Sequence, residues 1–517
     1  MRNYIILLFI GLAITMSSCR QDFVFETSKT GDLSFSKDTV YLDTVFTNIG
    51  SSTYSLKVYN KTNKDIKIPT IQLGKGLNSK YRITVDGMTG ENNNNRIFHD
   101  VELLAKDSMY IFIEVTADVA EANPTDFLYT DQIRLGTETD YQKVELVTLI
   151  QDAYFLYPKT IDDQGHTETL TIGDQEIYGF YLDPNDPVNG NEYEWGNDKP
   201  YVVYGYAAVP NGKTLNVQPG ARIHFHADSG LIVGNGGSLK INGNYSSTEA
   251  LENEVIFEGD RLEPDFSDVP GQWGTIWLTD GSTNNKIKNL TLRNATIGFL
   301  IDHNDGTTTT FENTQIYNCA NMGIYAKTAK IKGQNMVINS AGQFSLGCTL
   351  GGSYEFKHCT FNNNWSSSQQ LAVLIDNYYT DDANIQHAYS LDQADFKNCI
   401  IYGSNQIELR LNRATDTNLA FNTSFSKCLI KFNSTSFTTI PEYNFIYDTT
   451  SGEIKKTGSP DFMDVYNNKL MIGDDSVAKG FGDDLGITKD VINTDRVIDG
   501  NGKVDVGAYQ HIIFPSN

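Results

Sequence analysis

The sequence predicts an all-β protein in which a β-sandwich is followed by a parallel β-helix. Short runs of alternating apolar and polar residues occupy the N-terminal part of the chain, as expected for half-buried strands. Beyond them an interval of about 20 to 25 residues recurs, which is typical of a solenoid repeat. The 517 residues include 43 glycines and only 13 prolines, a composition that suits an ordered chain with many turns.

The net charge excludes one class of partner. The chain has 40 Lys and Arg against 64 Asp and Glu, which gives a formal charge of −24. The acidic residues are spread along the chain rather than gathered in a tail. Because a protein that binds the phosphate backbone needs clustered positive charge, no nucleic-acid partner is expected.

Residues 1–18 are predicted to be a signal peptide. Arg2 gives a positive start, residues 5–14 are apolar but too few to span a bilayer, and the segment 16–19 (Met-Ser-Ser-Cys) follows them. This arrangement resembles the signal of bacterial lipoproteins. The resemblance implies cleavage before Cys19, a diacylglycerol on its thiol, and an exported protein anchored to the outer membrane, facing the periplasm or the exterior. An ordinary secretory signal followed by an unrelated cysteine is the alternative.

Residues 19–151 are predicted to form the β-sandwich. The segment 46–50 (Phe-Thr-Asn-Ile-Gly) and the strand that follows it resemble the immunoglobulin-like domains of bacterial surface proteins. The resemblance implies an immunoglobulin-like sandwich but no particular function. The alternating runs are Tyr54-Leu56-Val58, Ile66-Ile68, Tyr81-Ile83-Val85, Tyr110-Phe112-Glu114 and Val144-Leu146.

The rest of the chain is predicted to contain the β-helix. A connecting segment is expected over residues 152–200, the β-helix over 201–445 and a closing segment over 446–517. Glycines fall between the first apolar pairs of the β-helix, where the chain must turn sharply. At the start of this region one apolar residue recurs at a constant interval, at Leu215, Ile223, Leu231 and Leu239.

A longer repeat follows Trp273. Each copy is predicted to add one coil, whose strands lie on the same residues of the neighbouring coils and point every second side chain inward. An asparagine amide at the turn can bond to its copies above and below while tolerating a left-handed backbone. One slot of the alignment holds Leu290, Thr314, Asn335, Cys359, Cys399 and Cys428, and the slot three residues earlier includes Lys332. The predicted asparagine column is Asn294, Asn318, Asn339 and Asn363.

Residues 195–435 resemble the right-handed parallel β-helix proteins that share a pectate-lyase-like architecture. The resemblance rests on the segments 215–220 (Leu-Asn-Val-Gln-Pro-Gly), 237–243 (Gly-Ser-Leu-Lys-Ile-Asn-Gly) and 273–276 (Trp-Gly-Thr-Ile). Residues 504–509 (Val-Asp-Val-Gly-Ala-Tyr) are similar to the closing segment of such proteins. The resemblance implies a right-handed coil on a bacterial surface and specifies no chemistry.

An insertion at residues 366–391 supplies the candidate site, because the interval from Cys359 to Cys399 exceeds the repeat. β-Helix lyases use a Ca²⁺-held acidic sugar with an Arg or Lys base, and β-helix hydrolases use two or three carboxylates. Aromatic rings beside carboxylates also suit glycan stacking, whereas a merely solvated acidic loop is the alternative. The candidate catalytic residues are Asp376, Asp381, Asp382, Arg410 and Arg413, and the candidate glycan-binding residues are Tyr378 and Tyr379.

No cofactor is expected, and Ca²⁺ is the one ion that the sequence leaves open. Asp302, Asn304 and Asp305 form an oxygen-rich turn that could hold it, but the full Ca²⁺-binding loop is missing, which favours a plain turn. The cysteines beyond Cys19 are odd in number and lack metal-ligand spacing, so they are expected to fill the core. They are Cys319, Cys348, Cys359, Cys399 and Cys428.

Together these observations predict a lipid-anchored protein of the cell envelope that binds a polysaccharide or a surface protein, or that has a structural role. The absence of a complete catalytic set favours binding over catalysis. A polysaccharide lyase or glycoside hydrolase acting on an extracellular polysaccharide is the alternative.

Overall fold

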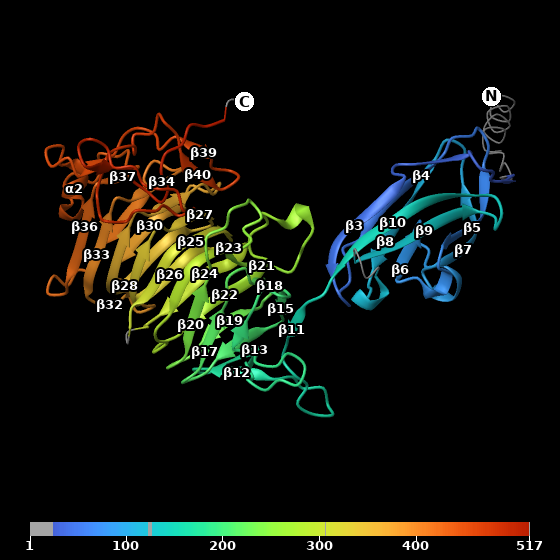
Figure 1. Ribbon diagram of the computed structural model, residues 1–517, viewed down its shortest axis with the longest axis horizontal. Coiled ribbons are helices and arrows are strands. Elements are labelled where there is room, and N and C mark those ends of the chain that lie inside the picture. The colour runs from blue at the N-terminus through green and yellow to red at the C-terminus, as the bar shows by residue number, and fades with distance from the viewer. Residues whose placement is uncertain (1–23, 123–126, 305–306, 516–517) are drawn as a thin grey trace, which may run out of the picture. The chain divides into compact units, whose positions relative to one another are not determined.

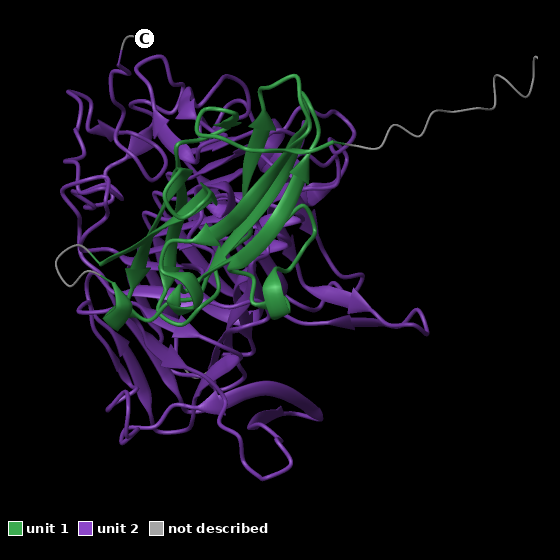
Figure 2. Cartoon of the chain, turned by 90° about the vertical axis from the view of Figure 1, so that its right-hand side faces the viewer, with its two compact units in different colours: residues 1–152 green, residues 153–517 purple. Residues whose placement is uncertain are grey.

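The computed structural model describes residues 24–122, 127–304 and 307–515, and the chain divides into two compact units, Met1–Asp152 and Ala153–Asn517 (Figure 2). The prediction of an all-β chain is confirmed, because strands dominate both units (Figure 1). The predicted signal peptide, Cys19 and Asp305 lie outside the described residues. Within the described residues, no helix is both long and apolar enough to cross a membrane.

The first unit consists of two sheets around one hydrophobic core, as expected for a sandwich. Its immunoglobulin-like topology stays a prediction. The larger sheet has the order β1-β5-β9-β10-β3, with β7 paired to β5, and the smaller has the order β2-β4-β8-β6. The larger contains β1 (Glu26–Thr27), β3 (Thr39–Phe46), β5 (Ile66–Leu73), β7 (Ile97–Leu103), β9 (Leu128–Gly136) and β10 (Tyr141–Gln151). The smaller contains β2 (Leu33–Phe35), β4 (Tyr54–Asn60), β6 (Tyr81–Val85) and β8 (Ser108–Val115).

Strand β8 has apolar residues on both faces. The buried face consists of Met109, Ile111, Ile113 and Val115. Tyr110, Phe112 and Glu114 lie on the other face, and both rings are exposed to solvent. The run Tyr110-Phe112-Glu114 therefore lies on the outside of this strand. The sequence could not predict this, because alternation alone does not distinguish two faces of similar hydrophobicity.

The second unit is a stack of mainly parallel strands in which strands pair with those of the next repeat, whereas β12 pairs antiparallel with β13. This pairing is the one that the predicted repeat requires. The stack begins with β11, which pairs with β15, so it already includes part of the segment expected to be a connection. The early strands are β11 (Tyr154–Leu156), β12 (Thr169–Ile172), β13 (Gln175–Tyr181), β14 (Glu194–Trp195), β15 (Tyr201–Val203), β16 (Tyr206–Val209), β17 (Thr214–Val217), β18 (Arg222–Phe225), β19 (Gly230–Val233), β20 (Ser238–Asn242), β21 (Val255–Gly259) and β22 (Trp273–Leu278).

Longer strands form the middle of the stack, and shorter ones end it. They are β23 (Lys286–Arg293), β24 (Ala295–Asp302), β25 (Thr309–Cys319), β26 (Met322–Gln334), β27 (Val337–Ala341), β28 (Phe344–Lys357), β29 (Thr360–Asn363), β30 (Leu371–Asp376), β33 (Leu391–Lys397), β34 (Ile400–Gly403), β35 (Leu409–Asn412), β36 (Phe421–Ser426), β37 (Cys428–Ile430) and β38 (Ile454–Lys455). A hairpin of β31 (Tyr378–Thr380) and β32 (Gln386–Ala388) lies apart from this sheet, as do β39 (Phe462–Asp464) with β40 (Lys469–Ile472) and β41 (Gly482–Asp483) with β42 (Lys503–Val504). The helices in the described part of the chain are single turns: η1 (Gly76–Asn78), η2 (Glu91–Asn93), η3 (Val119–Glu121), η4 (Pro264–Phe266), η5 (Pro441–Tyr443) and α2 (Asn444–Tyr447).

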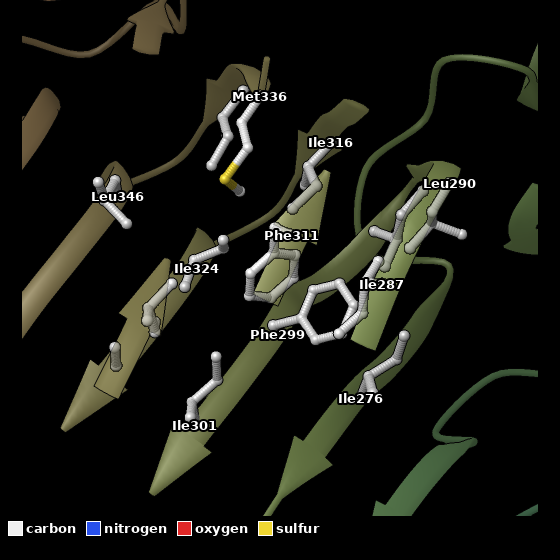
Figure 3. Close-up of a cluster of buried hydrophobic side chains, with 14 of the residues drawn as sticks. Ile276, Ile287, Leu290, Phe299, Ile301, Phe311, Ile316, Ile324, Met336 and Leu346 are labelled. Carbon is white, nitrogen blue, oxygen red and sulfur yellow. The ribbon is translucent and has the colours of Figure 1, made fainter. Parts of the chain in front are cut away.

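The interior of the stack contains columns of apolar side chains (Figure 3). One column has a gap at Gly333, where an added Cβ would lie 2.4 Å from the Met336 sulfur. The Met336 side chain thus occupies the space that an aromatic ring fills in neighbouring coils. The members of the column, in register, are Ile241, Ile287, Phe311, Gly333, Phe356, Phe396 and Phe425.

This register corrects the sequence alignment by one residue in one coil. Gln315 pairs with Val337, and Val337 pairs with Thr360, so Met336 shares a slot with Cys359. The sequence alignment instead predicts Asn335 in that slot and Lys332 in the aromatic column. Lys332 instead pairs with Thr310 on the outside of the stack.

The prediction of the asparagine column at the turns was also only partly correct. Asn294 and Asn318 have the positive φ that was expected, whereas Asn339 donates to the carbonyl of Val465 and does not have a positive φ. A second column of positive-φ residues precedes the apolar slot, and in it the Asn335 amide donates to Asn313 Oδ1 at 3.0 Å. Its members are Asn289, Asn313, Asn335, His358, Asn398 and Lys427.

The last strands of the stack and its outer side are covered by different parts of the C-terminal region. Phe445 of α2 stacks on Phe425 at 4.6 Å and extends the aromatic column. Residues 462–512 instead lie against the outer side, where the Tyr509 hydroxyl donates to Gln315 Oε1 at 3.1 Å and Ala508 N donates to Thr360 Oγ1 at 3.0 Å. Apolar residues of this segment cover outward-facing residues of the strands.

Arg496 holds the covering segment to the stack. Its side chain is 7% exposed, and its Nη2 donates to Asn335 Oδ1 at 2.9 Å and to the carbonyl oxygens of Gly507 and Ala508. Burial lowers the pKa of this guanidinium to about 10, while the nearby carboxylates of Asp490 and Asp505 favour its charged form.

Candidate functional site

The predicted insertion forms the hairpin of β31 and β32, and its polar residues mainly stabilise the hairpin itself. The His387 ring stacks on Tyr379 at 4.8 Å, and its Nε2 lies 2.7 Å from Asp381 Oδ2. Asp381 Oδ1 also accepts the backbone N–H groups of Ala383 and Ile385. The hydrogen bond with His387 is the main reason that the pKa of Asp381 is lowered. Asp381 therefore acts as a turn residue.

Asp376 is set apart from the hairpin tip, at the end of β30. It is largely buried and accepts the N–H of Leu350 at 2.9 Å. Burial raises its carboxyl pKa to about 6, as in many general acids. In the strand register Asp302 pairs with Lys327, and Lys327 pairs with Thr349. Asp376 occupies the corresponding outward position on the next strand. Asp302 and Asp376 are thus three strand spacings apart, about 14 Å, which is too far for a hydrolytic carboxylate pair.

The raised pKa of Asp376 predicts a pH-dependent cost to folding. A carboxyl with a higher pKa in the folded state stabilises the protein below its unfolded pKa, and this contribution is lost as the pH rises from about 4 to about 6. We therefore expect Asp376→Asn, which keeps an acceptor for Leu350 N–H, to raise the free energy of unfolding at pH 7 by about 1 to 3 kcal/mol. The gain should disappear below pH 4 in urea titrations. The exposed Asp382→Asn is the control, and an equal gain in it would contradict this account.

The other candidate catalytic residues are not brought together. Asp382 is exposed at the hairpin turn, Arg410 is exposed on β35, and Arg413 pairs with Glu442 at 3.3 Å. Of the two candidate glycan-binding residues, Tyr379 is 45% exposed and Tyr378 is half-buried. The described geometry thus offers an aromatic hairpin but no assembled set of catalytic groups in the insertion.

The candidate Ca²⁺ turn is already engaged with cationic and neutral donors. Asp302 Oδ2 lies 2.9 Å from the Lys327 ammonium, and Oδ1 lies 2.5 Å from His303 Nδ1. Asn304 is fully buried and donates to Thr309 Oγ1. Among the residues that the structure describes, no group of three or more His, Cys, Asp or Glu side chains is arranged to hold a metal. Asp302 and Asn304, the two members of the candidate turn that the structure describes, do not fit a Ca²⁺ site.

The five described cysteines are buried and free, as expected for core residues. Burial raises the pKa of the Cys319 thiol to about 12. Such thiols are poor nucleophiles and poor metal ligands at neutral pH.

A groove on the outside of the stack was not predicted. It has a volume of about 380 Å³ and crosses β20, β23, β25, β26 and β28. Five adjacent strands correspond to a length of about 19 Å at the usual strand spacing. Its lining residues are Ile241, Asn242, Lys286, Ile287, Lys288, Thr310, Phe311, Glu312, Lys332, Gly333, Gln334, Glu355 and Lys357.

The groove is positively charged although the whole chain is strongly acidic. Four lysines and two glutamates line it. Lys288 lies 3.5 Å from Glu312, and Lys332 and Lys357 lie 3.3 and 2.6 Å from Glu355. Among the described residues, no carboxylate lies within ion-pair distance of Lys286. The cationic side chains of this concave polar surface therefore outnumber the anionic ones by two.

The lysines follow the register of the stack and extend beyond the groove. Lys240 pairs with Lys286 on one side, and Lys357 pairs with Lys397 on the other. The Lys-x-Lys pair at 286 and 288 was a usable sequence signal. It was missed because the repeats were aligned on their inward apolar residues, and outward residues are not constrained by packing.

No family model matches the chain, and no curated protein matches it. Solved structures with weak similarity include the catalytic domain of a GH87 α-1,3-glucanase in complex with tetrasaccharides, at 11% identity and a TM-score of 0.23, over 78% of this chain and 89% of that one. A family 123 glycoside hydrolase from Clostridium perfringens is 8% identical over 23% of this chain, with a TM-score of 0.16. A protein of unknown function from Porphyromonas gingivalis W83 is 12% identical over 25% of this chain, with the same TM-score. The chain covers only 26% and 55% of these last two. Similarities this low support no conclusion about the fold or the activity of this chain.

Proposed function

We propose that this protein is an exported lipoprotein, anchored through Cys19, whose second unit is a right-handed parallel β-helix that binds an acidic polysaccharide in the lysine-lined groove. The groove is the observation that carries the proposal. It is concave, it runs across five strands, and it concentrates positive charge in a chain of net charge −24. A carboxylated or sulfated polymer matches both its charge and its elongated form.

The groove suits an extended polymer better than a small anion. Its lysines project from β23, β26 and β28, and β25 lies between the first two, so successive cations are spaced along the stack rather than gathered around one point. Glu312 and Glu355 hold Lys288 and Lys332 in place and leave hydrogen-bonding capacity for hydroxyl groups. The polar Asn242, Thr310 and Gln334 side chains add neutral donors and acceptors.

Charge reversal tests the groove. We expect the full chain to retain polygalacturonate at low salt, and the double variant Lys286→Glu with Lys332→Glu to weaken this binding by about tenfold to a hundredfold. Binding of the unaltered chain should also fall as salt is added, because exposed charges are screened. Lys37→Glu, an exposed reversal in the first unit, is the matched control.

The same assay separates the alternatives. New unsaturated or reducing ends in the polymer would favour a lyase or a hydrolase, and Asp376 would then be the first residue to change because of its raised pKa. If the acidic polymer is neither retained nor cleaved, or if the double variant binds as well as the unaltered chain, the proposed groove function is wrong and a protein-binding or structural role is favoured.

A further inference from the structure

The first unit carries an exposed aromatic surface that its core does not explain. Tyr59 on β4 and Tyr110 and Phe112 on β8 are 37%, 45% and 42% exposed on the outer face of the four-stranded sheet. The opposite face of β8 supplies the buried residues. Exposing three large rings to water on one sheet face is unfavourable, and these rings do not pack in the core. Such a cluster indicates an interaction surface.

The sheet register leaves the Phe112 ring uncovered. Phe112 lies between Ser55 on β4 and Thr84 on β6, and both neighbours are too short to cover a ring. The rings of Tyr110 and Phe112 are stacked, with centroids 6.0 Å apart and planes within 13° of each other. Both rings are exposed, and together they form an aromatic surface along β8, here called the platform.

Lys57 fixes the other end of the platform. Its Nζ lies 5.2 Å from the centroid of the Tyr110 ring and 5.4 Å from that of Tyr59. This cation–π geometry restrains both tyrosines. A restrained platform loses little side-chain entropy when a ligand binds.

A small polar pocket adjoins the platform at Phe112. It has a volume of about 200 Å³ and is lined by Arg82, Thr84, Asn95, Phe112 and Glu114. Arg82 Nη2 lies 3.4 Å from Glu114 Oε2. Because the cation and the carboxylate face each other, the pocket offers both donors and acceptors with little net charge.

We propose that this face of the first unit is a second glycan site, specific for a neutral hexose chain, and so goes beyond the acidic-polymer site of the second unit. A sugar ring has an apolar face that packs on an aromatic ring and a rim of hydroxyl groups that donate and accept hydrogen bonds. Phe112 and Tyr110 supply the stacking surface, and Arg82 and Glu114 supply polar partners for one terminal or branching hexose. A stable protein partner would need about 800 Å² of complementary surface, whereas three rings beside a polar pocket match a ligand of a few sugar units.

The test measures retention of neutral hexasaccharides of glucose, mannose or galactose by the full chain. We expect at least one of them to bind, Phe112→Ala to weaken it by about tenfold, and Phe112→Tyr to restore it. Tyr41→Ala, an exposed tyrosine on the other sheet, is the matched control. Unchanged melting temperatures would show that the variants fold.

Two outcomes would overturn the proposal. In one, no neutral hexasaccharide is retained. In the other, Phe112→Ala retains it as well as the unaltered chain does. These outcomes test the aromatic surface separately from the groove. The double variant Lys286→Glu with Lys332→Glu should reduce polygalacturonate binding and leave neutral-sugar binding intact.

Discussion

Replacing Cys19 with alanine is expected to move the protein from the membrane fraction to the soluble fraction. The proposed anchor depends on the Cys19 thiol, which no other side chain in the predicted signal can replace. Several acyl chains bury enough methylene groups to make membrane attachment effectively permanent, so their loss should change the distribution almost completely. Immunoblots of fractionated cells would measure it.

Ser18→Ala is the matched control for this experiment, because alanine keeps a small residue before the cysteine and leaves the thiol in place. Its distribution should equal that of the unaltered protein. Membrane retention of Cys19→Ala would refute the lipid anchor, and the ordinary secretory signal would then be the better account of residues 1–18.

Arg496→Met is expected to lower the free energy of unfolding by about 3 to 5 kcal/mol, the range observed when one member of a buried charge cluster is removed. Methionine has a similar length, so little cavity is created. Asn335 Oδ1 and the carbonyl oxygens of Gly507 and Ala508 would lose their common donor inside the protein. The carboxylates of Asp490 and Asp505 would also lose the nearby cation that balances them.

Arg410→Met provides the comparison, because Arg410 is exposed on the same stack. Guanidinium denaturation should show a change within about 0.5 kcal/mol for this surface variant. Equal stabilities of the Arg496 and Arg410 variants would mean that the covering segment does not depend on its buried arginine.

Periodicity predicted the strands and their parallel stacking because the alternation of inward and outward residues follows directly from backbone geometry. The same logic failed at Asn335, where asparagine occurs at the turn and the apolar slot is one residue later, at Met336. The pairing of Val337 with Gln315 on one side and with Thr360 on the other identifies the correct register, and the packing of Met336 beside Gly333 agrees with it. A pairwise property of two coils was therefore invisible to an alignment of single residues.

The functional sites were harder to predict than the fold. The insertion was found by its length, but Asp381 is engaged with His387 and the hairpin backbone rather than with Asp376. The lysine groove and the aromatic face both consist of outward residues, whose identity the core does not restrict. For Phe112 the alternation was visible, but two apolar faces on one strand left its direction undetermined.

The position of residues 462–512 on the outer side of the stack has a consequence for synthesis. They are translated after every coil that they cover, so a nascent stack has outward apolar residues such as Val337, Ile400 and Leu429 without their partners. Uncovered parallel strands of this kind are prone to self-association. Premature termination before this segment, or its proteolytic loss, would therefore leave the stack open to aggregation, and a chaperone that shields nascent chains would be most needed until residues 462–512 have been synthesised.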